Sequence, residues 1–139
     1  MSDTERVRET NDRFYAAMNS LDISEMDEVW MDAREAVCVH PGREAITGYE
    51  RIRESWLMIF AATDSMMIAS TNELINIVGD VAWVACTETI SIMTDEGLAA
   101  AAAQATNIFR RRGEAWRMIL HHASPVPLTT QDEWPDVIN

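Results

Sequence analysis

A change in the spacing of apolar residues divides the chain into a helical first half and a second half made of strands. Val7, Phe14 and Met18 recur at helical spacing after Thr4, which can cap a helix, and they predict a first helix that ends near Ser20. The turns and apolar faces that follow predict three shorter elements: a helix from Ser24 to about Trp30, a strand over residues 36–40, and a helix that opens at Gly48 and has Phe60 on its apolar face.

The second half alternates polar and apolar residues, which is the period of strands. Four strands are predicted, over residues 66–78, 81–93, 98–111 and 114–124, with turns at Gly79-Asp80, residues 94–97 and Arg112-Gly113. The alanine-rich run from Leu98 favours a helix on propensity alone, but a strand has to join the two hairpins, so we assign it to the sheet. Helices followed by a meander of long strands are an α+β plan. A strongly curved, mostly antiparallel sheet wrapped over three helices leaves a conical space, which is the expected ligand site.

Charge and cysteine content narrow the classes of partner. Acidic residues outnumber basic ones by 23 to 11, which gives a net charge of −12. Such a chain repels phosphate backbones and anionic lipids, so neither nucleic acid nor a membrane is an expected partner. The polar N-terminus lacks the apolar segment of a secretory signal, and Cys38 and Cys86 are too few and too far apart for a disulfide framework. These features predict a protein of the reducing cytoplasm with two free thiols.

The motifs predict neither a cofactor nor a metal. The three histidines form no His-x-His or His-x-x-x-His pair, and a strand would direct the adjacent His121 and His122 to opposite faces. The chain has neither a glycine-rich phosphate loop nor a Gly-x-Ser-x-Gly motif, so nucleotide-binding and acyl-transfer chemistry have no support. Any catalysis is therefore expected to depend on side chains alone.

A series of short motifs along the chain resembles one superfamily. The motifs are Asn11–Asp22, Trp30-Met31-Asp32, residues 38–42 (CVHPG), Gly48–Ile52, Ser55-Trp56, residues 79–84 (GDVAWV), and Trp116 followed by residues 122–124. In order and spacing they are similar to the nuclear-transport-factor-2-like superfamily, and within it to the SnoaL-like group, relatives of ketosteroid isomerase and of polyketide cyclases. The resemblance implies a cone-shaped α+β barrel over residues 1–124, followed by an irregular tail over residues 125–139.

The resemblance also implies roles for particular positions. Ketosteroid isomerases remove a proton next to a carbonyl group and hold the resulting enolate with hydrogen-bond donors. The base of the family precedes a proline at the end of the first strand, which is His40 here, and one oxyanion donor corresponds to Asn107. The second donor is a tyrosine of the first helix. That position holds Phe14, which cannot donate, with Tyr15 one residue further on, so the isomerase set is incomplete. The polyketide cyclases, which use an acid–base residue and ordered water, need less from these positions.

Alternation along the strands predicts which side chains line the cavity. If Arg112-Gly113 is a two-residue turn, Asn107, Phe109, Trp116 and His122 share one face, and a one-residue bulge would exchange His122 for His121. Aromatic residues supply the expected walls of the ligand site: Phe14, Tyr15, Trp30, Trp56, Trp83, Phe109 and Trp116.

These observations predict a protein that binds a small hydrophobic, carbonyl-bearing molecule, and they leave two interpretations of its function. In the first, it catalyses isomerisation, aldol cyclisation or dehydration, with His40 as base, Asn107 as oxyanion donor and His122 as a second acid–base group. In the second, it is a ligand-binding or association domain without catalysis. A homodimer is expected through an apolar outer sheet face, which is predicted to carry Thr106, Ile108, Ile119, Val84 and Cys86.

Overall fold

Three helices and one six-stranded sheet make up residues 1–128, the part of the chain that the computed structural model describes. The helices are α1 (Asp3–Ser20), α2 (Ile23–Val29) and α3 (Tyr49–Ala61). The strands are β1 (Val37–Val39), β2 (Ile46–Thr47), β3 (Ser65–Val78), β4 (Val81–Thr94), β5 (Gly97–Arg112) and β6 (Ala115–Val126). Their order in the sheet is β2-β1-β6-β5-β4-β3, and every neighbouring pair is antiparallel except β1 and β6. The predicted α+β class is confirmed; the short strand β2 is an addition that the sequence analysis did not predict.

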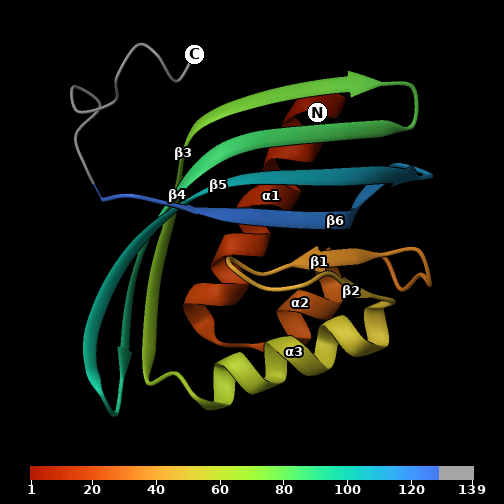
Figure 1. The fold of residues 1–139 in the computed structure, drawn as a ribbon. Coiled ribbons are helices and arrows are strands. Elements are labelled where there is room, and N and C mark those ends of the chain that lie inside the picture. The colour runs from red at the N-terminus through yellow and green to blue at the C-terminus, as the bar shows by residue number, and fades with distance from the viewer. Residues whose placement is uncertain (129–139) are drawn as a thin grey trace.

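The sheet bends strongly along β3, β4 and β5, and the helices lie on its concave side (Figure 1). Helix α1 crosses this side, and α3 lies below it, next to the lower ends of the bent strands. This arrangement gives the fold its cone shape, because the curved sheet encloses more space than the helices fill.

The first two helices begin slightly earlier than their expected capping residues. The side chain of Ser2, not Thr4, caps α1 by accepting the backbone N–H of Glu5 at 3.1 Å. Asp22 caps α2 by accepting the backbone N–H of Ser24 at 2.9 Å. Both residues are good helix caps because a short side-chain oxygen reaches the unpaired N–H groups of the first turn.

The alanine-rich segment at the start of β5 is a strand, as predicted. Residues 97–110 pair with β4, and residues 102–112 pair with β6. Ladder hydrogen bonds to β4, joined from Ala102 onward by those to β6, outweigh the preference of alanine for helices.

The turn between β5 and β6 differs from the expected one and carries a bulge. Arg112 pairs with Ala115, so the turn is Gly113-Glu114, and Gly113 takes the positive φ of 64° that such a turn requires. The register then shifts after Phe109, whose partner is Met118, and leaves Ile119 without a partner on β5. A one-residue bulge reverses the faces of all later residues of β6.

Strand β6 also extends beyond the predicted domain boundary at Ser124. It continues to Val126, where it still pairs with Ala102 of β5. The start of the expected irregular tail is therefore a strand, and residues 129–139 lie outside the described part of the chain.

The core lies between the concave face of the sheet and α1, with Phe14 near its centre. The Phe14 ring is fully buried, and its centroid lies 4.7 Å from that of His121 and 5.7 Å from that of Trp56. Close edge-on packing of aromatic rings adds to the free energy gained by burying them.

Replacing Phe14 with alanine should lower the free energy of unfolding by about 3–5 kcal/mol, because it removes a ring that no rearrangement of the core can replace. Met58 is 74% exposed on α3, so Met58→Ala should change it by less than about 0.5 kcal/mol. Urea denaturation of both variants measures the difference, and equal stabilities would contradict the central place of Phe14.

Candidate functional site

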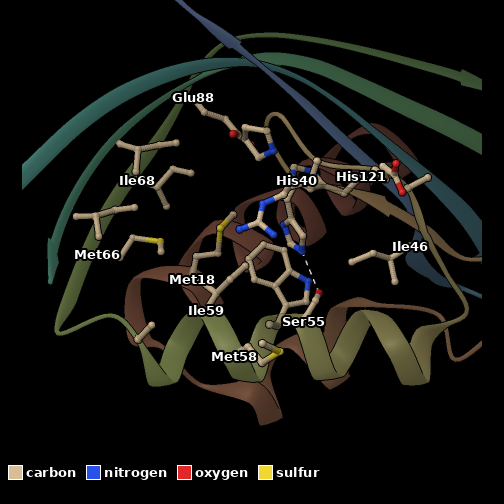
Figure 2. Close-up of a pocket in the computed structure, with 18 of the residues that line it drawn as sticks. Met18, His40, Ile46, Ser55, Met58, Ile59, Met66, Ile68, Glu88 and His121 are labelled. Atoms are coloured by element: carbon tan, nitrogen blue, oxygen red, sulfur yellow. Dashed lines mark hydrogen bonds between the residues drawn. The ribbon is translucent and has the colours of Figure 1, made fainter.

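A cavity of about 820 Å³ opens between the sheet and α3. Figure 2 shows Glu88 and His121 on the sheet side and Ser55 and Met58 on α3, with His40 between them. The apolar part of the wall comes from α1, α3 and the strands: Met18, Ile46, Trp56, Met58, Ile59, Met66, Ile68, Ile90 and Ile92. The remaining polar lining comes from Arg43, Glu44 and Arg51. The cavity is therefore largely apolar, with a small group of titratable side chains.

His121 is a buried neutral base that is held by an amide. Its Nδ1 lies 2.6 Å from Oδ1 of Asn107, whose NH₂ group donates to Oδ1 of Asn11 at 2.8 Å and to the Tyr15 hydroxyl at 3.0 Å. Because the amide oxygen can only accept, Nδ1 of His121 carries the proton and Nε2 carries the lone pair. No side chain within residues 1–128 makes a hydrogen bond to Nε2. Burial lowers the pKa of His121 to about 3, with a further contribution from the neighbouring histidines, so the ring stays neutral.

His40 follows β1 and bridges the sheet to α3. The Ser55 hydroxyl donates to the carbonyl oxygen of Ile52 at 2.6 Å, so its oxygen accepts the Nε2–H of His40 at 2.9 Å. This leaves the lone pair of His40 on Nδ1. Burial, together with the charge of Arg43, lowers the pKa of His40 to about 4. His40 is therefore also neutral near pH 7.

Glu88 of β4 is a further titratable group of the cavity wall, and it is not among the site residues predicted from the sequence. Its side chain is 2% exposed, and the Tyr15 hydroxyl donates to its Oε2 at 2.7 Å. Burial raises the pKa of Glu88 to about 7, although the Tyr15 hydrogen bond opposes the shift. The pKa of Tyr15 is raised as well, mainly by burial, so its hydroxyl remains a donor. At neutral pH Glu88 can therefore hold or release a proton.

The remaining expected site residues divide between the cavity and the core. Asn107 is fully buried behind His121 and is not part of the cavity wall. Of the expected aromatic walls, Trp56 lines the cavity, whereas five others are buried without lining it: Phe14, Tyr15, Trp30, Phe109 and Trp116. The Nε1–H of Trp116 donates to Asp3 near the start of α1 and not to a residue of the cavity wall.

Two expected site residues face the other way. The bulge at Ile119 directs His121 inward and leaves His122 exposed on the outer face, so His122 is not an acid–base group of the cavity. Trp83 is 37% exposed on the outer face, because the neighbouring Val84 is the residue that pairs with Asn107 on the inner face. The same alternation buries Cys86 and Val84, which were expected on the outer face.

No group of three or more His, Cys, Asp or Glu side chains within residues 1–128 is placed to hold a metal ion. In the same part of the chain, no helix is both long and apolar enough to cross a membrane. The described side chains of the site can themselves transfer protons and form hydrogen bonds.

The curved sheet, with three helices on its concave side and a cavity between sheet and helices, is the fold of the nuclear-transport-factor-2-like superfamily. The chain belongs to the SnoaL-like domain family, whose model matches residues 7–129. It is 34% identical to a candidate dehydratase of the NTF2-like family from Streptomyces avermitilis, with a TM-score of 0.84 over 90% of this chain and 96% of that one.

Other relatives carry different descriptions. A candidate calcium/calmodulin-dependent protein kinase type II association domain from Thiobacillus denitrificans is 29% identical, with a TM-score of 0.69 over 85% of this chain and 93% of that one. F-box protein SKIP8 of Arabidopsis thaliana is 22% identical over 128 residues, which are 92% of this chain and 53% of that protein. The chain thus spans about half the length of this curated relative.

Replacing Glu88 with glutamine should remove a pH-dependent term from the stability. The unfolded carboxyl has its ordinary pKa of 4.5 and the folded one a pKa of about 7. Between these values the folded state binds more protons, so this contribution is fully present below pH 4.5 and is lost as the pH rises through about 7. Between pH 4.5 and pH values above 7, the free energy of unfolding of the wild type should therefore fall by about 3 kcal/mol more than that of Glu88→Gln. Urea denaturation across this pH range tests it, and parallel curves for the two proteins would contradict it.

Proposed function

We propose that this protein is a cofactor-free enzyme that moves a proton on a small carbonyl-bearing substrate, with dehydration of a β-hydroxy carbonyl compound as its reaction. The observation that carries the proposal is Glu88, a buried carboxyl with a pKa of about 7 in the wall of a largely apolar cavity. Similarity to the candidate dehydratase from Streptomyces avermitilis supports dehydration over isomerisation or aldol cyclisation.

Glu88 can serve first as a base and then as an acid. Its carboxylate takes the proton from the carbon next to the carbonyl group, and the electron pair left behind forms a C=C bond as the bond to the β-hydroxyl breaks. The hydroxyl leaves with the proton that Glu88 has just accepted, so water is the second product and Glu88 returns to its starting state. A pKa near the working pH suits both proton transfers.

Neighbouring groups supply partners for the substrate's polar atoms. The lone pairs on Nε2 of His121 and Nδ1 of His40 can accept a hydrogen bond from a substrate hydroxyl. Trp56 has a buried Nε1–H with no acceptor within residues 1–128, although its ring lines the cavity. A buried donor without a partner costs about 1–3 kcal/mol, and a substrate carbonyl would supply the missing acceptor.

The roles expected from the resemblance change in this proposal. His40 was expected to be the base because an ordinary histidine titrates near neutral pH, but its pKa of about 4 makes it a weaker base than Glu88. Both amide hydrogens of Asn107 are already donated to Asn11 and Tyr15, so we assign Asn107 to the support of His121. Glu88 therefore takes the role of proton carrier.

Glu88→Gln should lower the rate of dehydration about 100-fold or more, because glutamine cannot exchange a proton. The assay follows the ultraviolet absorbance of the conjugated enone formed from a panel of aryl β-hydroxy ketones. In the wild type, kcat/KM should rise as the pH passes through about 7, where Glu88 loses its proton. Glu114→Gln, in the exposed turn before β6, is the matched control and should leave the rate unchanged.

Two results would contradict this function. Equal rates for the wild type and Glu88→Gln would exclude Glu88 as the proton carrier. Binding of the ketones without any turnover would instead favour a ligand-binding domain that has no catalytic activity.

Self-association is a second function, which a different observation favours. A row of side chains on the outer sheet face crosses β4, β5, β6 and β1 as paired neighbours: Trp83, Ile108, Leu120 and Val37. Leu74 of β3 is 67% exposed and lies on the same face. Apolar surface of this kind marks interaction sites, so we propose that two copies pair through it. The similarity to a candidate association domain from Thiobacillus denitrificans supports this.

Trp83→Asp should convert the proposed dimer into a monomer, because it places a charge in the paired apolar surface. Met58→Asp is the matched control, since Met58 is exposed on α3 and away from this face. Sedimentation velocity measures the mass of each, and an unchanged mass of Trp83→Asp would rule out this interface.

We also propose a cytoplasmic location. Cys38 and Cys86 are the two cysteines of the chain, and both are free and buried. Burial raises the pKa of both thiols, which keeps them protonated and unreactive. Free thiols are typical of a reducing compartment.

A further inference from the structure

A continuous chain of hydrogen bonds connects Glu73, on β3, to His121 in the cavity wall. Nδ2 of Asn11 donates to Oε2 of Glu73 at 3.0 Å. Nδ2 of Asn107 donates to Oδ1 of Asn11 at 2.8 Å, and Oδ1 of Asn107 accepts from Nδ1 of His121 at 2.6 Å. Asn11, Asn107 and His121 are almost completely buried, so water does not compete for these bonds.

A β-bulge brings Glu73 to the end of this chain. The register between β3 and β4 shifts between Thr71 and Leu74, and Asn72 takes a positive φ of 55°. Asparagine tolerates this conformation better than most residues. The bulge turns Glu73 towards α1 and leaves the next residue, Leu74, exposed on the outer face. The Ser70 hydroxyl donates to the same Oε2 of Glu73 at 2.8 Å.

The chemistry of the groups gives the chain a direction. An ionised carboxylate only accepts, so Asn11 has to present its NH₂ group to Glu73 and its oxygen to Asn107. Asn107 then has to present its NH₂ group to Asn11, which leaves its oxygen for His121. The only imidazole tautomer that satisfies this oxygen has the proton on Nδ1 and the lone pair on Nε2.

A branch of the chain ends at a second carboxyl. Asn107 also donates to the Tyr15 hydroxyl, which donates to Glu88. An ionised Glu88 imposes the same direction as Glu73, but a protonated Glu88 can donate to Tyr15 and so permits the reverse direction. Since the pKa of Glu88 is about 7, the direction is fixed by an ionised Glu73 alone wherever Glu88 is protonated.

We propose that Glu73 is a positioning residue that, through Asn11 and Asn107, fixes the tautomer of His121 and keeps the Nε2 lone pair available to a ligand. The use of that lone pair rests on the proposed function, but the tautomer itself is a property of the free protein. Glu73 acts through other residues and does not line the cavity.

Other titratable groups face this network from the surrounding elements. Asp12 of α1 is beside Glu73, Cys38 of β1 and Cys86 of β4 are beside Glu88, and His40 and His122 are beside His121. Among the described residues, none of these five side chains makes a hydrogen bond to Asn11 or Asn107. Their titration therefore cannot reverse the chain directly.

The test is the tautomer of His121 in Glu73→Gln, read from ¹⁵N shifts and couplings of the imidazole in ligand-free, ¹⁵N-labelled protein. Spectra at about pH 5.5 and about pH 8.5 bracket the titration of Glu88, while His121 stays neutral at both. The wild type should show only the Nδ1–H tautomer at both values. Glutamine can also donate to Asn11, so Glu73→Gln should show about a tenth or more of the Nε2–H tautomer at the lower pH and none at the higher.

Ser70→Ala is the matched control, because it removes the other hydrogen bond to Glu73 and leaves that of Asn11 intact; it should behave as the wild type. An Nε2–H tautomer in the wild type, or an unchanged tautomer in Glu73→Gln at both pH values, would overturn the proposal. Neither result depends on turnover, so a protein without dehydratase activity could still show the predicted tautomers. Conversely, if the protein is an active dehydratase but the tautomer of His121 is the same in the wild type and in Glu73→Gln, this inference is refuted and the proposed function is not.

Discussion

The side chain of Asn107 makes three hydrogen bonds in a position from which water is excluded, and the candidate site depends on all of them. It donates to Asn11 and Tyr15 on α1 and accepts from His121 on β6. A buried amide without partners would cost several kcal/mol, so the helix and the strand can only pack in the arrangement that satisfies it. The same bonds that specify how α1 lies on the sheet therefore also specify the orientation of the cavity histidine.

Burial acts on His40, His121 and Glu88, three titratable groups of the cavity wall, in one direction, towards the uncharged form. It lowers the pKa of His40 and His121 to about 4 and about 3, and it raises that of Glu88 to about 7. In a chain with a net charge of −12, the part of the cavity around these three groups is thus a region with little charge of its own, and the remaining polar lining comes from Arg43, Glu44 and Arg51. An apolar ligand can enter such a region at a low desolvation cost. A pKa of about 7 keeps Glu88 able both to accept and to release a proton near neutral pH, as the proposed reaction requires.

The sequence was sufficient to predict every described element except the short strand β2, but not the faces of every strand. Helix and strand periods are local properties, so the three helices and the long strands could be recognised from spacing alone. The bulge at Ile119 has no such local signal, because Ile119 and Leu120 are both apolar, and it decides whether His121 or His122 faces inward.

The error for β4 could have been avoided with information already in the sequence. Counting back from Met93 opposite Leu98 across the predicted turn places Val84 opposite Asn107, on the same face. Alternation from Val84 then places Glu88 inside and Trp83 outside. The aromatic ring of Trp83 does not decide its face, because an aromatic side chain is as suitable for an interface as for a cavity wall.

Alternation along the strands also explains how one fold can serve both proposed functions. On β4, Glu88 faces the cavity and Trp83 faces outward; on β6, His121 faces the cavity and Leu120 faces outward. Substitutions on one face leave the other face largely unchanged, because the backbone of the strand lies between the two sets of side chains. The proposed catalytic groups and the proposed association surface can therefore change independently, and relatives described as a candidate dehydratase and as a candidate association domain are compatible with a single architecture.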